Sequence, residues 1–179
     1  MVRKTETFDI ARLKHPATRQ EAFAELVKAT SHQLYGVIRR LVQYHEDADD
    51  VLQNTYLKAW QSLDSFRGDS LLTSWLYKIA VNESLSFLSR QSDTDALTDI
   101  DSARDLASDP YFDGDEIQLL LQQAIASLPE KQRVVFNLKY FEQMKYEDMS
   151  TLLDTSVGAL KASYHLAVKK IHLFFEEHG

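Results

Sequence analysis

The chain has 179 residues, 44% of them hydrophobic, which is enough for one domain or two small ones with a buried core. Only 5 Gly and 3 Pro occur, which favours an all-α protein with few tight turns. No apolar run approaches the roughly 18 residues that span a bilayer, and the opening MVRKTETFDIARLKH lacks the apolar stretch of a signal peptide. The absence of Cys excludes disulfides and thiolate metal sites and agrees with a reducing cytoplasm, where we expect the protein.

The negative charge of the chain is concentrated in one segment. The net charge is −7, but residues 91–116 contain eight Asp, one Glu and one Arg and carry −8 by themselves. The rest of the chain therefore carries +1 and includes local basic clusters. Charge by segment is a better guide to partners than the average, so the acidic total does not exclude nucleic-acid binding.

Periodicity and composition divide the chain into four parts, with no internal repeat. We expect residues 1–18 to form an N-terminal tail and residues 19–91 a first helical domain, because apolar residues recur there at helical intervals. Residues 92–113 are rich in Asp and Ser without a sustained period, which predicts an acidic flexible linker. Helical patterning resumes in residues 114–179; Asp113 and Glu116 resemble a capping box, and Pro129 suits a first helical turn. The fold expected is therefore two small helical domains joined by the linker.

The stretch HEDADDVLQNTYLKAWQSLDSF, residues 45–66, predicts an amphipathic helix over 48–63. Its core-facing stripe comprises Ala48, Val51, Leu52, Thr55, Tyr56, Ala59, Trp60 and Leu63. Asp47 occupies the expected N-cap position, and acidic residues in the first turn complement the helix dipole. A zinc site is not favoured, because His45-Glu46 lacks a second His four residues later and no third ligand is in view.

The opposite face of this helix carries Asp50, Gln53, Asn54, Leu57 and Gln61. An apolar residue with a polar rim is typical of a protein-docking surface. A single exposed Leu is also ordinary on any protein surface, so periodicity alone leaves both interpretations open.

The next segment joins a polar loop to an aromatic helix. The loop is Arg67-Gly68-Asp69-Ser70, and the helix after it buries a stripe that includes Leu72, Trp75, Leu76, Ile79 and Ala80. Lys78, Asn82 and Arg90 lie off that stripe. Aromatic side chains beside basic and amide groups suit single-stranded nucleic acid. For Trp75, however, we expect a place in the core.

Residues 146–175 have the layout of a helix-turn-helix. A short helix turns inward Met149, Leu152 and Leu153, and LDTS forms a tight turn with Thr155 and Ser156 as candidate caps. The second helix turns inward Val157, Leu160, Tyr164, Ala167, Ile171 and Phe174, and outward Lys161, His165 and Lys169, with Ala159, Ala162, Ser163 and Lys170 around them. Such a second helix enters the major groove, and its lysines neutralise phosphates. An ordinary helical hairpin with a solvated basic face remains the alternative at this point.

Taken together, these segments resemble the extracytoplasmic-function sigma factors, the compact two-domain group of bacterial sigma factors. DADDVLQNTYLKAWQSLDSF is similar to the DAEDxxQexFxxxW…F signature of region two, and RGDSLLTSWLYKIAVNESLSFL is similar to its F…TWLYrIAxN segment. LPEKQRVVFNLKYFEQMKYEDMSTLLDTSVGALKASYHLAVKKI resembles region four. The match covers most of residues 19–175, with motifs in the family's order and spacing.

The resemblance implies roles for the surfaces described above. Region two, residues 19–91, would bind the clamp helices of the largest subunits of core RNA polymerase through Asp50, Gln53, Asn54 and Leu57. Its loop and following helix would engage the non-template strand of the minus-ten promoter element through Arg67, Gly68, Asp69, Ser70, Lys78 and Asn82, with a base flipped into the loop. Region four, residues 114–179, would read the minus-thirty-five element through Ser156, Lys161, Ala162, Ser163, His165 and Lys169.

The sequence departs from the family in the recognition helix. The common pattern GTVKSRLxRA is here replaced by residues 158–167, in which Ser163 and Leu166 stand where arginines are expected. The second helix is therefore expected to make fewer phosphate contacts than in the family. The base preference of better-matched relatives cannot be transferred to this chain. The resemblance further implies regulation by a separate anti-sigma protein, often membrane-bound, since no sensory C-terminal domain follows. The acidic linker would mimic RNA near the polymerase cleft.

Two other classes of function compete with a promoter-specificity subunit. A stand-alone helix-turn-helix regulator would bind palindromic duplex DNA as a dimer without polymerase. A purely helical interaction protein, such as an anti-sigma antagonist or a sigma mimic, would bind no DNA; the basic face of the second helix argues against it. We expect no enzyme, cofactor or small-molecule substrate, because no nucleophile–base pair or metal set is visible.

Overall fold

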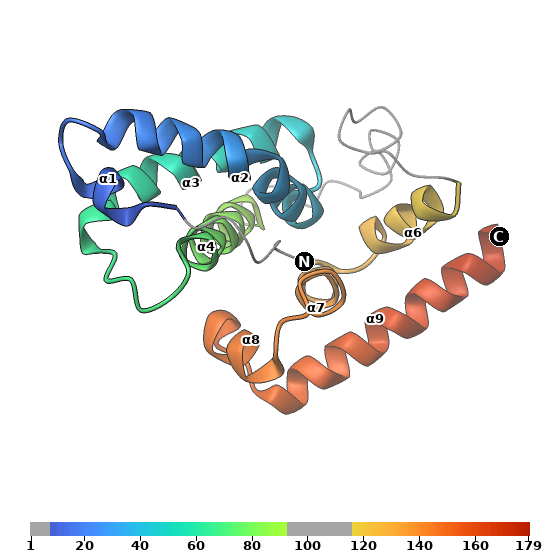
Figure 1. Ribbon diagram of the computed structural model, residues 1–179. Coiled ribbons are helices and arrows are strands. Elements are labelled where there is room, and N and C mark those ends of the chain that lie inside the picture. Colours follow the sequence, from blue (N-terminus) through green and yellow to red (C-terminus); the bar gives the residue numbers. More distant parts are fainter. Residues whose placement is uncertain (1–7, 93–115) are drawn as a thin grey trace. The chain divides into compact units, whose positions relative to one another are not determined.

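The computed structural model describes residues 8–92 and 116–179, and all regular structure in these ranges is helical (Figure 1). The chain forms two compact units, residues 1–95 and residues 96–179. The predicted all-α fold with two helical domains is therefore confirmed. The predicted acidic linker, its proposed RNA-like role and the capping residue Asp113 lie outside the described residues.

In the described residues 8–92, the first unit has three long helices and two short ones. These are α1 (Ile10–Lys14), α2 (Arg19–Val42), α3 (His45–Ser62), the 3-10 turn η1 (Leu63–Ser65) and α4 (Leu72–Ser92). The helices α2, α3 and α4 all pack against one another, and α1 packs on α2 and η1. The periodic apolar residues fill the centre, among them Leu26, Ile38, Leu41, Ala48, Val51, Ala59, Leu63, Leu76, Ala80 and Val81. Burial of these stripes drives the bundle, because each helix is apolar on one side only.

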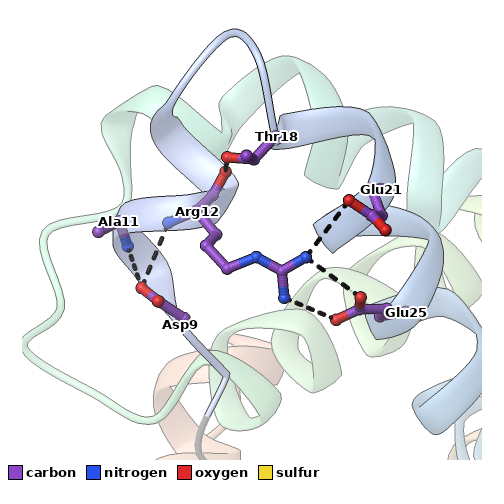
Figure 2. A network of polar contacts seen from close by, with 6 residues as sticks. All are labelled: Asp9, Ala11, Arg12, Thr18, Glu21 and Glu25. Atoms are coloured by element: carbon purple, nitrogen blue, oxygen red, sulfur yellow. Dashed lines mark hydrogen bonds and ion pairs between the residues drawn. The ribbon is translucent and has the colours of Figure 1, made fainter.

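The helix α1 corrects the expectation of an N-terminal tail. Asp9 caps it by accepting hydrogen bonds from the backbone N–H groups of Ala11 (2.9 Å) and Arg12 (3.2 Å). The Arg12 guanidinium donates to Glu25 of α2 (3.0 and 3.2 Å), and its backbone carbonyl accepts from Thr18 Oγ1 (2.8 Å; Figure 2). Leu13 is buried. A helix this short needs such tertiary contacts, because isolated short helices are unstable in water.

In residues 116–179, the described part of the second unit, the helices are α6 (Glu116–Ala126), α7 (Glu130–Tyr140), α8 (Tyr146–Leu153) and α9 (Val157–His178). The long helix α9 packs against the other three. Its core contains Ala124, Ile125, Leu128, Phe136, Ala167 and Ile171. Pro129 lies at the N-cap position of α7, one residue before the predicted first turn, and its carbonyl accepts from the N–H of Arg133 (2.9 Å).

Candidate functional site

The outward face of α3 carries all four residues predicted to contact a protein partner. Asp50, Gln53, Asn54 and Leu57 are exposed and follow one another at helical steps of three, one and three residues. The side chain of Leu57 is 61% exposed, while Ala48, Val51, Thr55 and Ala59 on the opposite side are buried. We call these four residues the α3 outer face; it is a small apolar centre with a polar rim.

The start of α3 differs from the prediction. The helix begins at His45 with Tyr44 as its N-cap, so Asp47 is not the cap but a residue of the first turn. The helix α3 starts earlier than predicted because α2 ends at Val42 and the chain turns at Gln43, which has a φ of 71°. Burial, and then the carboxylates of Asp50 and Glu46, raise the pKa of Asp47, although Arg39 opposes the shift.

Trp60, predicted in the core, is instead 37% exposed. Its ring packs edge-on against Phe23 of α2 (centroids 5.1 Å apart) and under the guanidinium of Arg19 (4.6 Å). At the end of α3 these groups cover only part of the ring. Trp60 follows Leu57 by three residues, so the two apolar side chains are neighbours on the helix surface.

The predicted nucleic-acid loop is exposed between two buried residues. Phe66 and Leu72 are buried, and Arg67, Gly68, Asp69 and Ser70 between them are all exposed. Gly68 has a φ of 81°, a left-handed conformation that glycine adopts without strain. Leu71, which sequence reasoning missed, is 65% exposed. The doublet Leu71-Leu72 was the available signal, because adjacent residues of a helix point in different directions and only Leu72 continues the core stripe.

The helix α4 continues this surface. Lys78 and Asn82 are exposed. Leu71, Trp75, Lys78 and Asn82 follow one another at intervals of four, three and four residues, so they lie along one side of the helix. Trp75 is half-buried and packs against Phe66 with ring centroids 5.2 Å apart, so its predicted core position is only partly realised. The structure thus brings the predicted loop and the two α4 residues onto one side of the first unit.

The helices α8 and α9 form the predicted helix-turn-helix. Asp154 ends α8 in the left-handed conformation (φ 48°, ψ 47°), and Ser156 caps α9 by accepting a hydrogen bond from the N–H of Ala159 (3.2 Å). The predicted outward residues Lys161, Ala162, His165 and Lys169 are exposed, whereas Ser163 is half-buried. Of the predicted inward residues, Met149, Leu160, Ala167 and Ile171 are buried, and Leu152, Leu153, Val157, Tyr164 and Phe174 are half-buried.

Two lysines converge on one aromatic ring beside this helix-turn-helix, an arrangement that the sequence did not indicate. The ammonium groups of Lys139 (α7) and Lys161 (α9) lie 4.7 Å and 5.7 Å from the ring centre of Tyr146, the first residue of α8. Within residues 8–92 and 116–179, no carboxylate forms an ion pair with either lysine. The cation–π contacts, together with a hydrogen bond from Lys139 to the Met144 carbonyl (3.2 Å), orient the two charges but leave them un-neutralised. The trio Lys139–Tyr146–Lys161 is therefore suited to an anion.

An aromatic stack joins α7 to α9, the helices that carry the two lysines. Phe136 stacks on Tyr140 (5.1 Å) and on Tyr164 of α9 (5.7 Å). Burial, and then the neighbouring Tyr146 and Tyr140 hydroxyls, raise the pKa of Tyr164, so its ring remains neutral. The contact fixes α9 against α7, and hence Lys161 relative to Lys139.

Neither a metal centre nor a membrane span is found in the part of the chain that the structure describes. No three His, Cys, Asp or Glu side chains gather there as metal ligands would. None of its helices combines the length and hydropathy needed to cross a bilayer.

Comparison with known families and curated proteins gives consistent matches. Sigma-70 region 2 matches residues 20–94, and Sigma-70, region 4 matches residues 118–171. The RNA polymerase sigma-H factor of Pseudomonas aeruginosa is 34% identical over 160 residues, covering 80% of each chain. The ECF RNA polymerase sigma-E factor of Escherichia coli strain K12 is 32% identical over 155 residues, covering 80% of this chain and 81% of the relative.

Solved structures agree in fold. The sigma factor RpoE from Bartonella quintana, solved with the anti-sigma factor NepR, superposes with a TM-score of 0.64 at 22% identity, covering 89% of this chain and 99% of that one. CnrH, solved with the cytosolic domain of CnrY, has a TM-score of 0.59 at 21% identity, covering 96% and 100%.

Proposed function

The chain belongs to the extracytoplasmic-function group of sigma factors, the promoter-specificity subunits of bacterial RNA polymerase. We propose that the three surfaces described above bind core polymerase, the minus-ten element and the minus-thirty-five element, respectively. The observation that carries this proposal is the α3 outer face. It combines an exposed Leu57 with three polar neighbours inside the region-two match.

The α3 outer face docks on core RNA polymerase. Interfaces gain most of their free energy from a few residues that become fully buried, and Leu57 has the most apolar surface to lose among the four. Asp50, Gln53 and Asn54 form the polar rim that sets orientation. Trp60 extends the apolar part of this surface toward α2.

The loop Arg67–Ser70, with Lys78 and Asn82 of α4, engages the minus-ten element. Flipping a base from the stack costs a few kcal/mol, which contacts to the extruded base must offset. The exposed Leu71 and half-buried Trp75 offer apolar surface beside the polar loop, while Lys78 attracts the backbone.

The helix α9 reads the minus-thirty-five element in the major groove. Ser156 caps its N-terminus, and Lys161, Ala162, Ser163, His165 and Lys169 supply the side chains toward DNA. Lys139 joins Lys161 as a phosphate contact, because both ammonium groups lie near one ring without a carboxylate partner in the described ranges.

We also propose that an anti-sigma protein regulates this chain, as the resemblance to the family implies. Two structural neighbours were solved in complex with such a protein or with the cytosolic domain of a partner. We place the protein in the cytoplasm, where polymerase is found, and assign it no catalytic activity of its own.

The test is binding of labelled protein to bacterial core RNA polymerase with no DNA present. Gln53→Ala/Leu57→Ala is expected to weaken binding more than about tenfold, since truncating a residue that is fully buried at the centre of an interface can cost above about 1 kcal/mol. Gln20→Ala/Lys28→Ala on the exposed side of α2 is the matched control and should bind as wild type. Absence of wild-type binding to core, with affinity for palindromic duplex DNA alone, would instead support the stand-alone regulator.

A further inference from the structure

The entry to the promoter loop is held by a residue from the far N-terminal end of the first unit. The Lys14 ammonium, on the last residue of α1, donates a hydrogen bond of 2.6 Å to the backbone carbonyl of Phe66. Phe66 is the last buried residue before the exposed loop. Fifty-two positions of sequence separate the two partners, so the contact exists only because α1 packs on η1.

The Phe66 carbonyl determines where the loop begins. It belongs to the same planar peptide unit as the N–H of Arg67, so its direction sets the direction in which Arg67 leaves the core. The rest of Phe66 is already fixed, since its ring is buried against Trp75 and its N–H donates to the Leu63 carbonyl (3.2 Å). The rotation that remains is about the Cα–C bond of Phe66, which turns its carbonyl, and the hydrogen bond from Lys14 restricts it.

The helix α1 is a firm base for this bond. The Asp9 cap closes the N-terminal end of α1, and the Arg12–Glu25 ion pair and the Thr18 hydrogen bond tie α1 to the start of α2, as Figure 2 shows. The Glu25 contact is also the main reason that the pKa of Arg12 is raised. Lys14 therefore projects from a helix held at both ends and not from a free tail.

The segment before the loop does not depend on Lys14 for its own position. Arg19 donates to the Trp60 carbonyl (2.7 Å) and pairs with Asp64 (3.0 Å), and Leu63 is buried. Removing the Lys14 ammonium would therefore leave η1 in place and release only the Phe66–Arg67 peptide. A loss of discrimination in a Lys14 variant would therefore report the position of the loop and not the unfolding of η1.

We propose that Lys14 is a positioning residue for minus-ten recognition. By holding the Phe66 carbonyl, it sets the orientation from which Arg67–Ser70 meet the extruded base. The proposal rests on the proposed function of this loop and adds to it a residue outside the DNA surface. Lys14 itself contacts no DNA.

The experiment uses reconstituted holoenzyme and a template library with randomised minus-ten and minus-thirty-five bases. Transcripts are sequenced, and discrimination is expressed as the yield from the preferred base divided by the yield from each substitute. This ratio is independent of the fraction of active protein. Lys14→Met, Lys14→Arg and the control Lys28→Met are compared with wild type, together with their affinity for core polymerase.

Lys14→Met is expected to lose roughly tenfold in discrimination at minus-ten positions, the equivalent of a charge-assisted hydrogen bond. Discrimination at minus-thirty-five and affinity for core should stay unchanged, and Lys14→Arg should retain most of the wild-type ratio. Unchanged minus-ten discrimination in Lys14→Met, or an equal loss at both elements, would overturn the proposal. Failure of the wild-type holoenzyme to transcribe any library member would instead contradict the proposed function.

Discussion

The guanidinium of Arg19 lies 4.6 Å from the ring centre of Trp60 and also donates a 2.7 Å hydrogen bond to the Trp60 backbone carbonyl. One side chain from the start of α2 thus fixes both the ring and the backbone at the end of α3. Since Trp60 neighbours Leu57, this contact determines the shape of one edge of the α3 outer face.

Arg19→Met is expected to free the Trp60 ring and lower the free energy of unfolding by about 1 kcal/mol, the size of a partly exposed cation–π contact. The Asp64 partner contributes little because it is largely exposed. Fluorescence in a Trp75→Phe background, where Trp60 is the only tryptophan, should shift to the red as the ring gains water. An unchanged emission maximum with unchanged stability would show that Phe23 alone positions the ring.

Lys139→Ala and Lys161→Ala are each expected to reduce the salt dependence of promoter binding by holoenzyme. Loss of one phosphate contact lowers the slope of log affinity against log salt by about 0.9. Binding to a selected promoter is measured across a salt series for each variant.

The matched control for this series is Lys131→Ala, an exposed lysine at the start of α7. Its slope should equal that of wild type. A wild-type slope in Lys139→Ala would remove Lys139 from the DNA surface and leave Lys161 as the contact on its own.

Asp154→Gly and Asp154→Ala should differ in stability by about 1 kcal/mol, with Gly the more stable. Asp154 closes α8 in the left-handed region, where a Cβ atom costs energy and glycine has no such cost. Urea unfolding of the two variants side by side measures the difference. Equal stabilities would mean that the turn relaxes out of this conformation when the side chain changes.

Asp47→Asn is expected to raise the melting temperature at neutral pH. The pKa of Asp47 is raised above its ordinary value of 3.8, so the folded state binds the proton at higher pH than the unfolded chain. Ionisation therefore costs folding free energy above the folded pKa, and Asn removes that cost. Below 3.8 both states are protonated, and the advantage of Asn should disappear.

Asp148→Asn serves as the control for removal of a first-turn charge, since Asp148 is exposed at the start of α8. Loss of its favourable interaction with the helix dipole should slightly lower the melting temperature. Equal increases in both variants would indicate a general effect of net charge and not the burial of Asp47.

Helical periodicity was sufficient to predict which way most of the long helices face. The outward position of Leu57 and the exposed Lys161, His165 and Lys169 follow from helix geometry alone, once the core stripe is identified. Roles for these residues remain proposals, because periodicity places a side chain without showing what it binds.

Features that depend on tertiary contact were missed or wrong. The helix α1 is too short for a periodic pattern, although Asp9 as a cap was a usable signal. Trp60 fits the inward stripe by spacing, but the groups packed around the end of α3 leave part of its ring uncovered. Lys139 meets Tyr146 only because the chain reverses between α7 and α8, where Gln143 has a φ of 52°.

The exposed residues 67–71 lie between Phe66 and Leu72, both of which are anchored in the core. Substitutions in this interval are therefore expected to change the exposed surface with little effect on folding, apart from Gly68 with its left-handed backbone. If the proposed minus-ten role of this loop holds, a change of promoter preference here would need no compensating change in the core.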